Sequence, residues 1–228
     1  MGFSSTLKAT SGAELAYECL SANQYRITLQ VYRGCSEPLL PNTQTIDLSS
    51  ISCGNAFMAT LNLEQSYEIS GIHPTQIANS VCNGGTLPGF ELFVYADTIS
   101  LPQTCADWLL AWTGCCRNPD FTNLSTTGSS IYVEAGIDSR YLHSSPQFNR
   151  VQLPYYCANS NTTSELVGPT DYPSNMDSFV RVLTCPLQGA NSCLTYATGL
   201  SVNEPFHLAT GSSIVINNLS RKTVFDAE

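Results

Sequence analysis

Ten cysteines are the residues of this chain whose chemistry follows most directly from their type and number. An even, dense set of cysteines in a strand-rich chain indicates disulfide bonds, and disulfide bonds persist outside the reducing cytosol. We therefore expect every cysteine to be disulfide-bonded and the protein to lie outside the cell or on its surface. The ten are Cys19, Cys35, Cys53, Cys82, Cys105, Cys115, Cys116, Cys157, Cys185 and Cys193.

The spacing of the cysteines bears on two of the pairings. Cys115 and Cys116 are adjacent, and the ~3.8 Å between successive Cα atoms is shorter than the ~4.4–6.8 Å of a usual disulfide. We therefore expect each of them to bond elsewhere. Cys185 and Cys193 flank the short, turn-rich segment PLQGANS, which predicts a local bridge. The other pairings cannot be read from the sequence.

No group of residues has the spacing typical of an active site or a metal site. The chain lacks the Gly-x-Ser-x-Gly turn of a serine hydrolase. Its three histidines, His73, His143 and His207, are far apart in the sequence. Zinc usually takes its ligands in two close pairs, and no Cys-x-x-Cys occurs. We therefore expect no enzyme, no catalytic residue, no metal and no cofactor.

Trp108 and Trp112 have two interpretations. Side by side on a surface, they would form an aromatic platform for a glycan, which makes a carbohydrate-binding module the alternative function. Buried, they would pack in the core beside the Cys115-Cys116 pair. We favour burial, because large aromatic side chains contribute most to stability in a core.

Composition excludes several classes of partner. The net charge is −9, only 12% of residues are charged, and the only lysines are Lys8 and Lys222. Nucleic acids and anionic lipids would be repelled, so we expect neither as a partner. No apolar run reaches the ~18 residues that span a bilayer. The first ten residues, MGFSSTLKAT, lack the pattern of a secretion signal, so we expect that a signal was removed or lies upstream.

The hydrophobic pattern predicts strands. Tyr25, Ile27, Leu29 and Val31 alternate with polar residues, which is the period of a half-buried strand. The segment at 21–24 reads as a hairpin loop. Short helices are expected at 72–78 and at 107–112. Further strands are expected at 15–20, 43–51, 56–63, 66–70, 90–100, 130–137, 149–157, 178–185 and 213–219.

Regular short strands with turns between them indicate an all-β sandwich or barrel. Composition changes near residue 150, where Asn, Ser, Thr and Pro become frequent. We therefore expect a cysteine-rich, disulfide-stapled β-sandwich module of the immunoglobulin or cadherin type at 1–150. A smaller β-domain or part-domain is expected at 151–228.

Four phrases of the sequence resemble a module of very large Bacteroidetes cell-surface proteins of the adhesin or gliding-motility-associated type. The likeness covers roughly residues 14–157. The phrases are ELAYECLSANQYRITLQVYRGCS (14–36), LPGFELFVYADTISLP (87–102), CADWLLAWTGCCRNPDFTNLS (105–125) and SSPQF (144–148).

This resemblance implies a function and a setting. Such proteins are exported by the type IX secretion route and built from serial β-domains that act in attachment, gliding or cell-cell contact. The expected partners are sister domains of the same or identical chains, in a homo-oligomer or larger assembly, and surface glycans or other cells. The segment Asp97-Thr98-Ile99 is similar to the O-glycan acceptor pattern of such proteins, so Thr98 is a candidate glycosylation site. Relatives carry an Asp-rich stretch suited to calcium, of which only Asp177 is present here, so calcium is doubtful.

Overall fold

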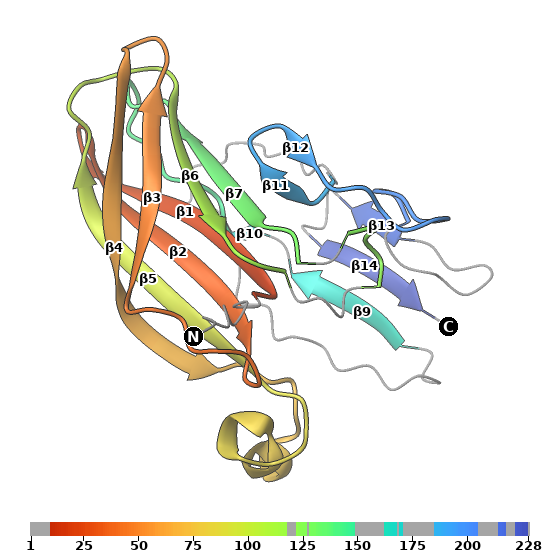
Figure 1. Cartoon of the computed structure of the whole chain (residues 1–228). Helices are drawn as coiled ribbons and strands as arrows, with labels where there is room; N and C mark the ends of the chain where they lie inside the picture. The colour runs from red at the N-terminus through yellow and green to blue at the C-terminus, as the bar shows by residue number, and fades with distance from the viewer. Residues whose placement is uncertain are drawn as a thin grey trace, which may run out of the picture.

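The computed structural model of the chain describes residues 10–117, 122–126, 128–148, 162–167, 169–170, 185–204, 214–217 and 222–227. Strands dominate these residues, and one large curved sheet carries most of them (Figure 1). The all-β, disulfide-bonded class expected from the sequence is confirmed.

Seven strands form the large sheet, and each runs antiparallel to its neighbours. Their order is β1-β2-β5-β4-β3-β6-β7, so β1 and β7 are the edge strands. The sheet curves until these two edges approach each other, which gives a nearly closed barrel. The strands are β1 (Gly12–Ser21), β2 (Gln24–Gly34), β3 (Thr43–Ser50), β4 (Asn55–Glu68), β5 (Phe90–Ser100), β6 (Trp108–Gly114) and β7 (Ile131–Ile137).

The hydrophobic core fills the inside of this barrel. In β2, the side chains of Tyr25, Ile27, Leu29 and Val31 are at most 1% exposed, and the residues between them stay partly exposed. Burial of one aliphatic side chain of this size contributes about 1.5–3 kcal/mol. The period-two prediction for this segment is therefore confirmed.

The hairpins follow the predicted turns with two adjustments. Asn23, in the β1–β2 turn, adopts a positive φ of 59°, which asparagine tolerates better than most residues. The strands predicted at 56–63 and 66–70 are one strand, β4, with a register irregularity between Leu63 and Gln65. A bulge of this kind bends a strand without ending it.

The short helix predicted at 107–112 is wrong, because this segment is strand β6. Trp108, Leu110 and Trp112 alternate with half-exposed residues along it. β6 pairs with β3 on one side and β7 on the other, so cross-strand hydrogen bonding decides the conformation. The spacing of four between the tryptophans fits one face of a helix and alternate positions of a strand equally well.

The helix predicted at 72–78 forms as a 3-10 helix, η1 (Pro74–Asn79), and a second one follows as η2 (Val81–Asn83). Pro74 occupies the first turn of η1, where its missing N–H has no cost. Together the two helices form the long connection between β4 and β5.

The C-terminal part contributes smaller sheets. The predicted boundary at 150 and the predicted strand at 149–157 lie outside the described residues, as does nearly all of 178–185. The strand predicted at 213–219 corresponds to β13. The described strands are β8 (Gln147–Phe148), β9 (Thr162–Val167), β10 (Pro169–Thr170), β11 (Leu187–Gly189), β12 (Ser192–Cys193), β13 (Ile214–Asn217) and β14 (Lys222–Ala227).

The segment at 185–204 packs against the connection between β6 and β7. Arg117 donates a hydrogen bond of 2.9 Å to the carbonyl of Leu187. Leu124 and Tyr196 form an antiparallel bridge, and the N–H of Ser125 bonds to the carbonyl of Thr195 at 2.9 Å. The β11–β12 hairpin is therefore joined to the barrel near the β7 edge.

Candidate functional site

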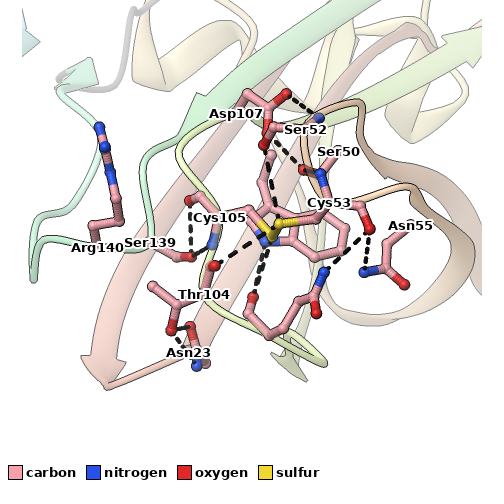
Figure 2. Close-up of a disulfide and its surroundings, with 12 residues drawn as sticks. Asn23, Ser50, Ser52, Cys53, Asn55, Thr104, Cys105, Asp107, Ser139 and Arg140 are labelled. Carbon is pink, nitrogen blue, oxygen red and sulfur yellow. Dashed lines mark hydrogen bonds between the residues drawn. A yellow bond between two sulfur atoms is a disulfide. The ribbon is translucent and has the colours of Figure 1, made fainter.

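One end of the barrel is fixed by the Cys53–Cys105 disulfide (Figure 2). Cys53 lies in the turn between β3 and β4, and Cys105 lies just before β6, 52 positions further along the chain. Their Cα atoms are 6.2 Å apart, within the usual range for a disulfide. The bond therefore ties the β3–β4 hairpin to the strand beside it.

Asp107 adds a hydrogen-bonded clamp at the same turn. Its carboxylate accepts hydrogen bonds from the hydroxyls of Ser50 and Ser52, and from the N–H of Ser52 at 2.8 Å. These donors, the Ser50 hydroxyl first, lower the pKa of Asp107 to about 2. The carboxylate is therefore charged at neutral pH and holds the turn to the start of β6.

The remaining contacts at this end use neutral side chains. The hydroxyl of Ser139 accepts a hydrogen bond of 2.9 Å from the N–H of Cys105 and donates one of 3.0 Å to its carbonyl. The amide of Asn23 donates to the hydroxyl of Thr104 at 3.0 Å. Figure 2 shows these groups converging around the disulfide from separate turns, while Arg140 points away. We call this group of Asn23, Ser50, Ser52, Cys53, Thr104, Cys105, Asp107 and Ser139 the disulfide clamp.

A second disulfide, Cys35–Cys82, joins the end of β2 to η2. Gly89 passes so close that a Cβ built on it would lie 2.5 Å from the sulfur of Cys82. The carbonyl of Gly89 also accepts a hydrogen bond of 2.9 Å from the N–H of Cys35. A glycine is therefore required here, because a side chain would occupy the space of the disulfide.

Two further disulfides join cysteines that are close in the sequence. The local Cys185–Cys193 bridge expected from the sequence is present. Cys115 and Cys116 are bonded to each other, contrary to the expectation that they would bond elsewhere. The peptide bond between them is cis and their Cα atoms are 3.0 Å apart, so this pair forms below the usual range of Cα separations from which the expectation was argued.

Cys19 differs from the expectation that all ten cysteines are bonded. It lies on β1, and its half-buried thiol is free. The other eight described cysteines are already paired with one another, so none of them is open to Cys19. Cys157, the tenth cysteine, lies outside the described residues.

The two tryptophans are buried in the core, as favoured from the sequence. Trp108 is 1% exposed and Trp112 is 4% exposed. The indole N–H of Trp108 donates to the carbonyl of Gln103, and that of Trp112 donates to the side chain of Gln44, both at 3.2 Å. Neither ring can therefore serve as an exposed platform, and the glycan contact proposed for them as an alternative is wrong.

Thr98, the candidate glycosylation site, is exposed on β5. Its N–H donates to the carboxylate of Asp97 at 2.7 Å, and Asp97 also accepts from the amide of Asn62 at 2.9 Å. Thr98 is therefore an exposed residue beside a hydrogen-bonded carboxylate. Glycosylation of Thr98 stays a prediction.

The described histidines do not meet. The ring of His73 caps η1 by accepting a hydrogen bond from the N–H of Thr75 at 3.3 Å. The ring of His143 contacts that of Tyr17 edge to face. His207 lies outside the described residues. His73 and His143 therefore have local structural roles.

A groove of about 660 Å³ runs along the β1 and β7 edges. Residues 12–16 of β1 form one side, and residues 131–134 of β7 form the other. Pro146 and the segment at 185–187 also line it. We call this the edge groove. The sequence gives no direct sign of it, because it depends on how far the sheet curves.

Two carboxylates face the edge groove, each held by a tyrosine. The hydroxyl of Tyr32 donates to Glu14 at 2.8 Å, and that of Tyr132 donates to Glu134 at 2.7 Å. Burial raises the pKa of Glu14, and the hydrogen bond from Tyr32 partly offsets this. Burial and the Glu134 carboxylate raise the pKa of Tyr132 to about 12. Both tyrosines therefore stay protonated donors at neutral pH.

The cation in this groove is Arg117. Its guanidinium donates to the carbonyl of Leu187, but its buried Nε has no hydrogen-bond partner. Burial lowers the pKa of Arg117 from a high starting value, so it remains charged at neutral pH. The groove thus combines two acidic groups, one arginine and the edges of two strands.

Comparison of the chain with protein-family models, with curated proteins and with solved structures found no match in any of the three. The interpretation of its function therefore depends on the sequence pattern and on the geometry described above.

The described residues also show neither a membrane-spanning helix nor a cluster of metal ligands. No helix among the described residues is long and apolar enough to cross a membrane. Within the same part of the chain, no three or more histidine, cysteine or acidic side chains come together as metal ligands.

Proposed function

We propose that this chain is a structural and adhesive module of a large extracellular bacterial surface protein or filament, with no enzymatic activity of its own. In this role it acts in cell attachment, gliding or cell-cell contact. The observation that carries the proposal is the set of disulfides in the barrel, which tie a loop or turn to a strand at two separate places.

Disulfide bonds support a location outside the reducing cytoplasm. The described residues contain four of them: Cys35–Cys82, Cys53–Cys105, Cys115–Cys116 and Cys185–Cys193. Each bond that closes a loop stabilises the fold by about 2–4 kcal/mol. Such reinforcement suits a protein that must keep its shape under mechanical load at a cell surface.

The resemblance to Bacteroidetes surface proteins supports the more specific role. It makes the type IX secretion route the proposed path of export and sister β-domains the proposed first partners. Thr98, exposed beside Asp97, is the proposed point of glycosylation. We do not carry the carbohydrate-binding alternative forward, because the two tryptophans on which it depended are buried.

The test is a deletion of the parent protein in its host, with surface labelling of intact cells. Labelling should reach the protein without lysis, and the deletion strain should lose attachment, gliding or cell contact while growing at the normal rate. Complementation with the wild-type gene should restore the behaviour. Protein found only after lysis, or unchanged surface behaviour in the deletion strain, would contradict the proposal.

A further inference from the structure

The outer face of the barrel carries paired side chains along the edge groove. Glu14 lies directly opposite Gln30, and Ala16 lies directly opposite Thr28, in the antiparallel register of β1 and β2. Directly opposed residues of two strands share one face of a sheet, and the intervening Leu29 points into the core. Because both pairs line the groove, the groove lies over this outer face, outside the sheet.

The walls of the edge groove are held in place by bonds within the described chain. Residues 131–134 form one wall, and their strand, β7, is paired with β6. The segment at 185–187 forms another wall. The Cys185–Cys193 disulfide and the hydrogen bond from Arg117 fix this segment against the barrel. A frame of this kind exists before a ligand arrives, which lowers the ordering cost of binding.

Several polar groups in the groove have unused capacity for hydrogen bonds. Glu14 and Glu134 each accept one hydrogen bond from a tyrosine through a single oxygen. Among the described residues, nothing donates to the second oxygen of either carboxylate, and the side chains of Thr28 and Gln30 have no hydrogen-bond partner. The groove therefore offers two free acceptors beside a hydroxyl and an amide, which both donate and accept.

These free groups match a neutral ligand rather than a charged one. An anionic group only accepts hydrogen bonds and would face the charges of Glu14 and Glu134. An ammonium group only donates, so it would leave the amide N–H of Gln30 unpaired, and it would lie in the same groove as the guanidinium of Arg117. A hydroxyl both donates and accepts. Neighbouring hydroxyls of one molecule can therefore donate to the carboxylates and accept from Gln30.

The rest of the lining is largely apolar. It includes Leu15, Val133, Pro146, Pro186 and Leu187. The volume of about 660 Å³ lies within the ~300–1,000 Å³ of small-molecule sites, which combine an apolar lining with a few polar groups. A sugar ring has both kinds of surface, because its C–H groups can cover apolar side chains while its hydroxyls bond to polar ones.

We propose that the edge groove binds a neutral saccharide, with Glu14, Gln30 and Glu134 as the main hydrogen-bonding residues. The site shares no residue with the pair of buried tryptophans, which belong to the core. The inference deepens the proposed function by naming the class of molecule to which an adhesive module would attach. It rests on that function only for its biological setting.

The experiment measures binding of the full chain to a printed array of neutral, acidic and amino-substituted glycans. The wild-type chain should bind neutral glycans of the array. Glycans that differ from a bound one only by an amine or a carboxylate in place of a hydroxyl should bind roughly tenfold more weakly. Titration calorimetry with the bound glycans in solution supplies the dissociation constants.

Three variants test the groove itself. Gln30→Ala should weaken binding roughly three- to tenfold, because it removes neutral hydrogen bonds. Glu134→Gln should weaken it roughly fivefold, because hydrogen bonds to a charged acceptor are stronger than those to an amide. Ala16→Trp should abolish binding, because its side chain would fill the space over the outer face.

Matched controls change the same residue types outside the lining of the groove. Gln65→Ala on β4 and Glu18→Gln on β1 should bind as the wild type does. The melting temperature of every variant is measured beside its affinity. A loss of binding at an unchanged melting temperature separates a lost contact from a lost fold.

Three results would overturn the inference. They are a wild-type chain that binds no neutral glycan of the array, a preference for the acidic or amino-substituted glycans, and binding that Gln30→Ala and Ala16→Trp both leave unchanged. A surface protein that is needed for attachment but binds no glycan would sink this inference and leave the proposed function intact. Glycan binding by a protein that stays inside the cell would do the reverse.

Discussion

The carboxylate of Asp107 connects two parts of the chain that are far apart in the sequence. It accepts hydrogen bonds from Ser50 and Ser52 in the β3–β4 turn, while its own backbone leads into β6. Nothing in the residues next to Asp107 distinguishes it from the other acidic residues of the chain. Its role depends on the approach of a turn more than 50 residues earlier, and no local pattern indicates that approach.

Removal of this carboxylate should have an effect that depends on pH. The folded state holds the pKa of Asp107 at about 2, below the value of about 3.9 in an unfolded chain. Ionised Asp107 therefore stabilises the fold above about pH 4, and this stabilisation is lost as the pH falls towards 2. Asp107→Ala should lower the melting temperature at pH 7, and its difference from wild type should shrink between pH 4 and pH 2.

Asp47→Ala is the matched control, because it removes an exposed carboxylate from the neighbouring strand β3 with the same change in net charge. Thermal melts of both variants across this pH range make the comparison. An Asp107→Ala deficit that is the same at pH 7 and pH 2 would show that the carboxylate does not act through its charge.

At the scale of elements, most strands of the large sheet could be predicted and β6 could not. β2 follows from a period-two pattern, because one of its faces is buried in the barrel, whereas β5 follows from a continuous apolar run that is buried at five successive residues. β6 could not be assigned, because the spacing of Trp108 and Trp112 fits a helix as well as a strand. Most disulfide pairs and the edge groove were also out of reach, because they depend on the order in which the strands assemble.

The Cys53–Cys105 disulfide of the clamp and the Cys185–Cys193 disulfide close loops of different length. Cys53–Cys105 spans 52 positions and Cys185–Cys193 spans 8. By chain entropy, loss of the first should cost about 4 kcal/mol and loss of the second about 2.5 kcal/mol. Urea denaturation of the Cys53→Ser/Cys105→Ser and Cys185→Ser/Cys193→Ser proteins would measure both costs.

The Cys53→Ser/Cys105→Ser protein should also unfold in one transition that includes the whole barrel, because the clamp lies against the core. Cys105 and Trp108 both belong to the buried cluster. Equal stability of the two double variants, or a clamp variant as stable as wild type, would contradict the view that this disulfide organises one end of the barrel.

At the scale of the whole molecule, the structure combines a disulfide-bonded barrel with one pair of edge strands, β1 and β7, that no ladder joins in the described part of the chain. The disulfides of β2 and of the β3–β4 turn secure the closed part of the sheet, whereas β1 and β7 leave the edge groove between them. The lysine-poor composition and the net charge of −9 are compatible with the proposed role outside the cell. Under that proposal, shape and durability are the properties that the molecule provides.

Peptide mapping of the native protein without reduction, read by mass spectrometry, tests this account most directly. The account predicts linked peptides for Cys35–Cys82 and Cys53–Cys105, together with the local Cys185–Cys193 link and the joined pair Cys115–Cys116. Free thiols at Cys35, Cys53, Cys82 and Cys105 in protein taken directly from its host would contradict it.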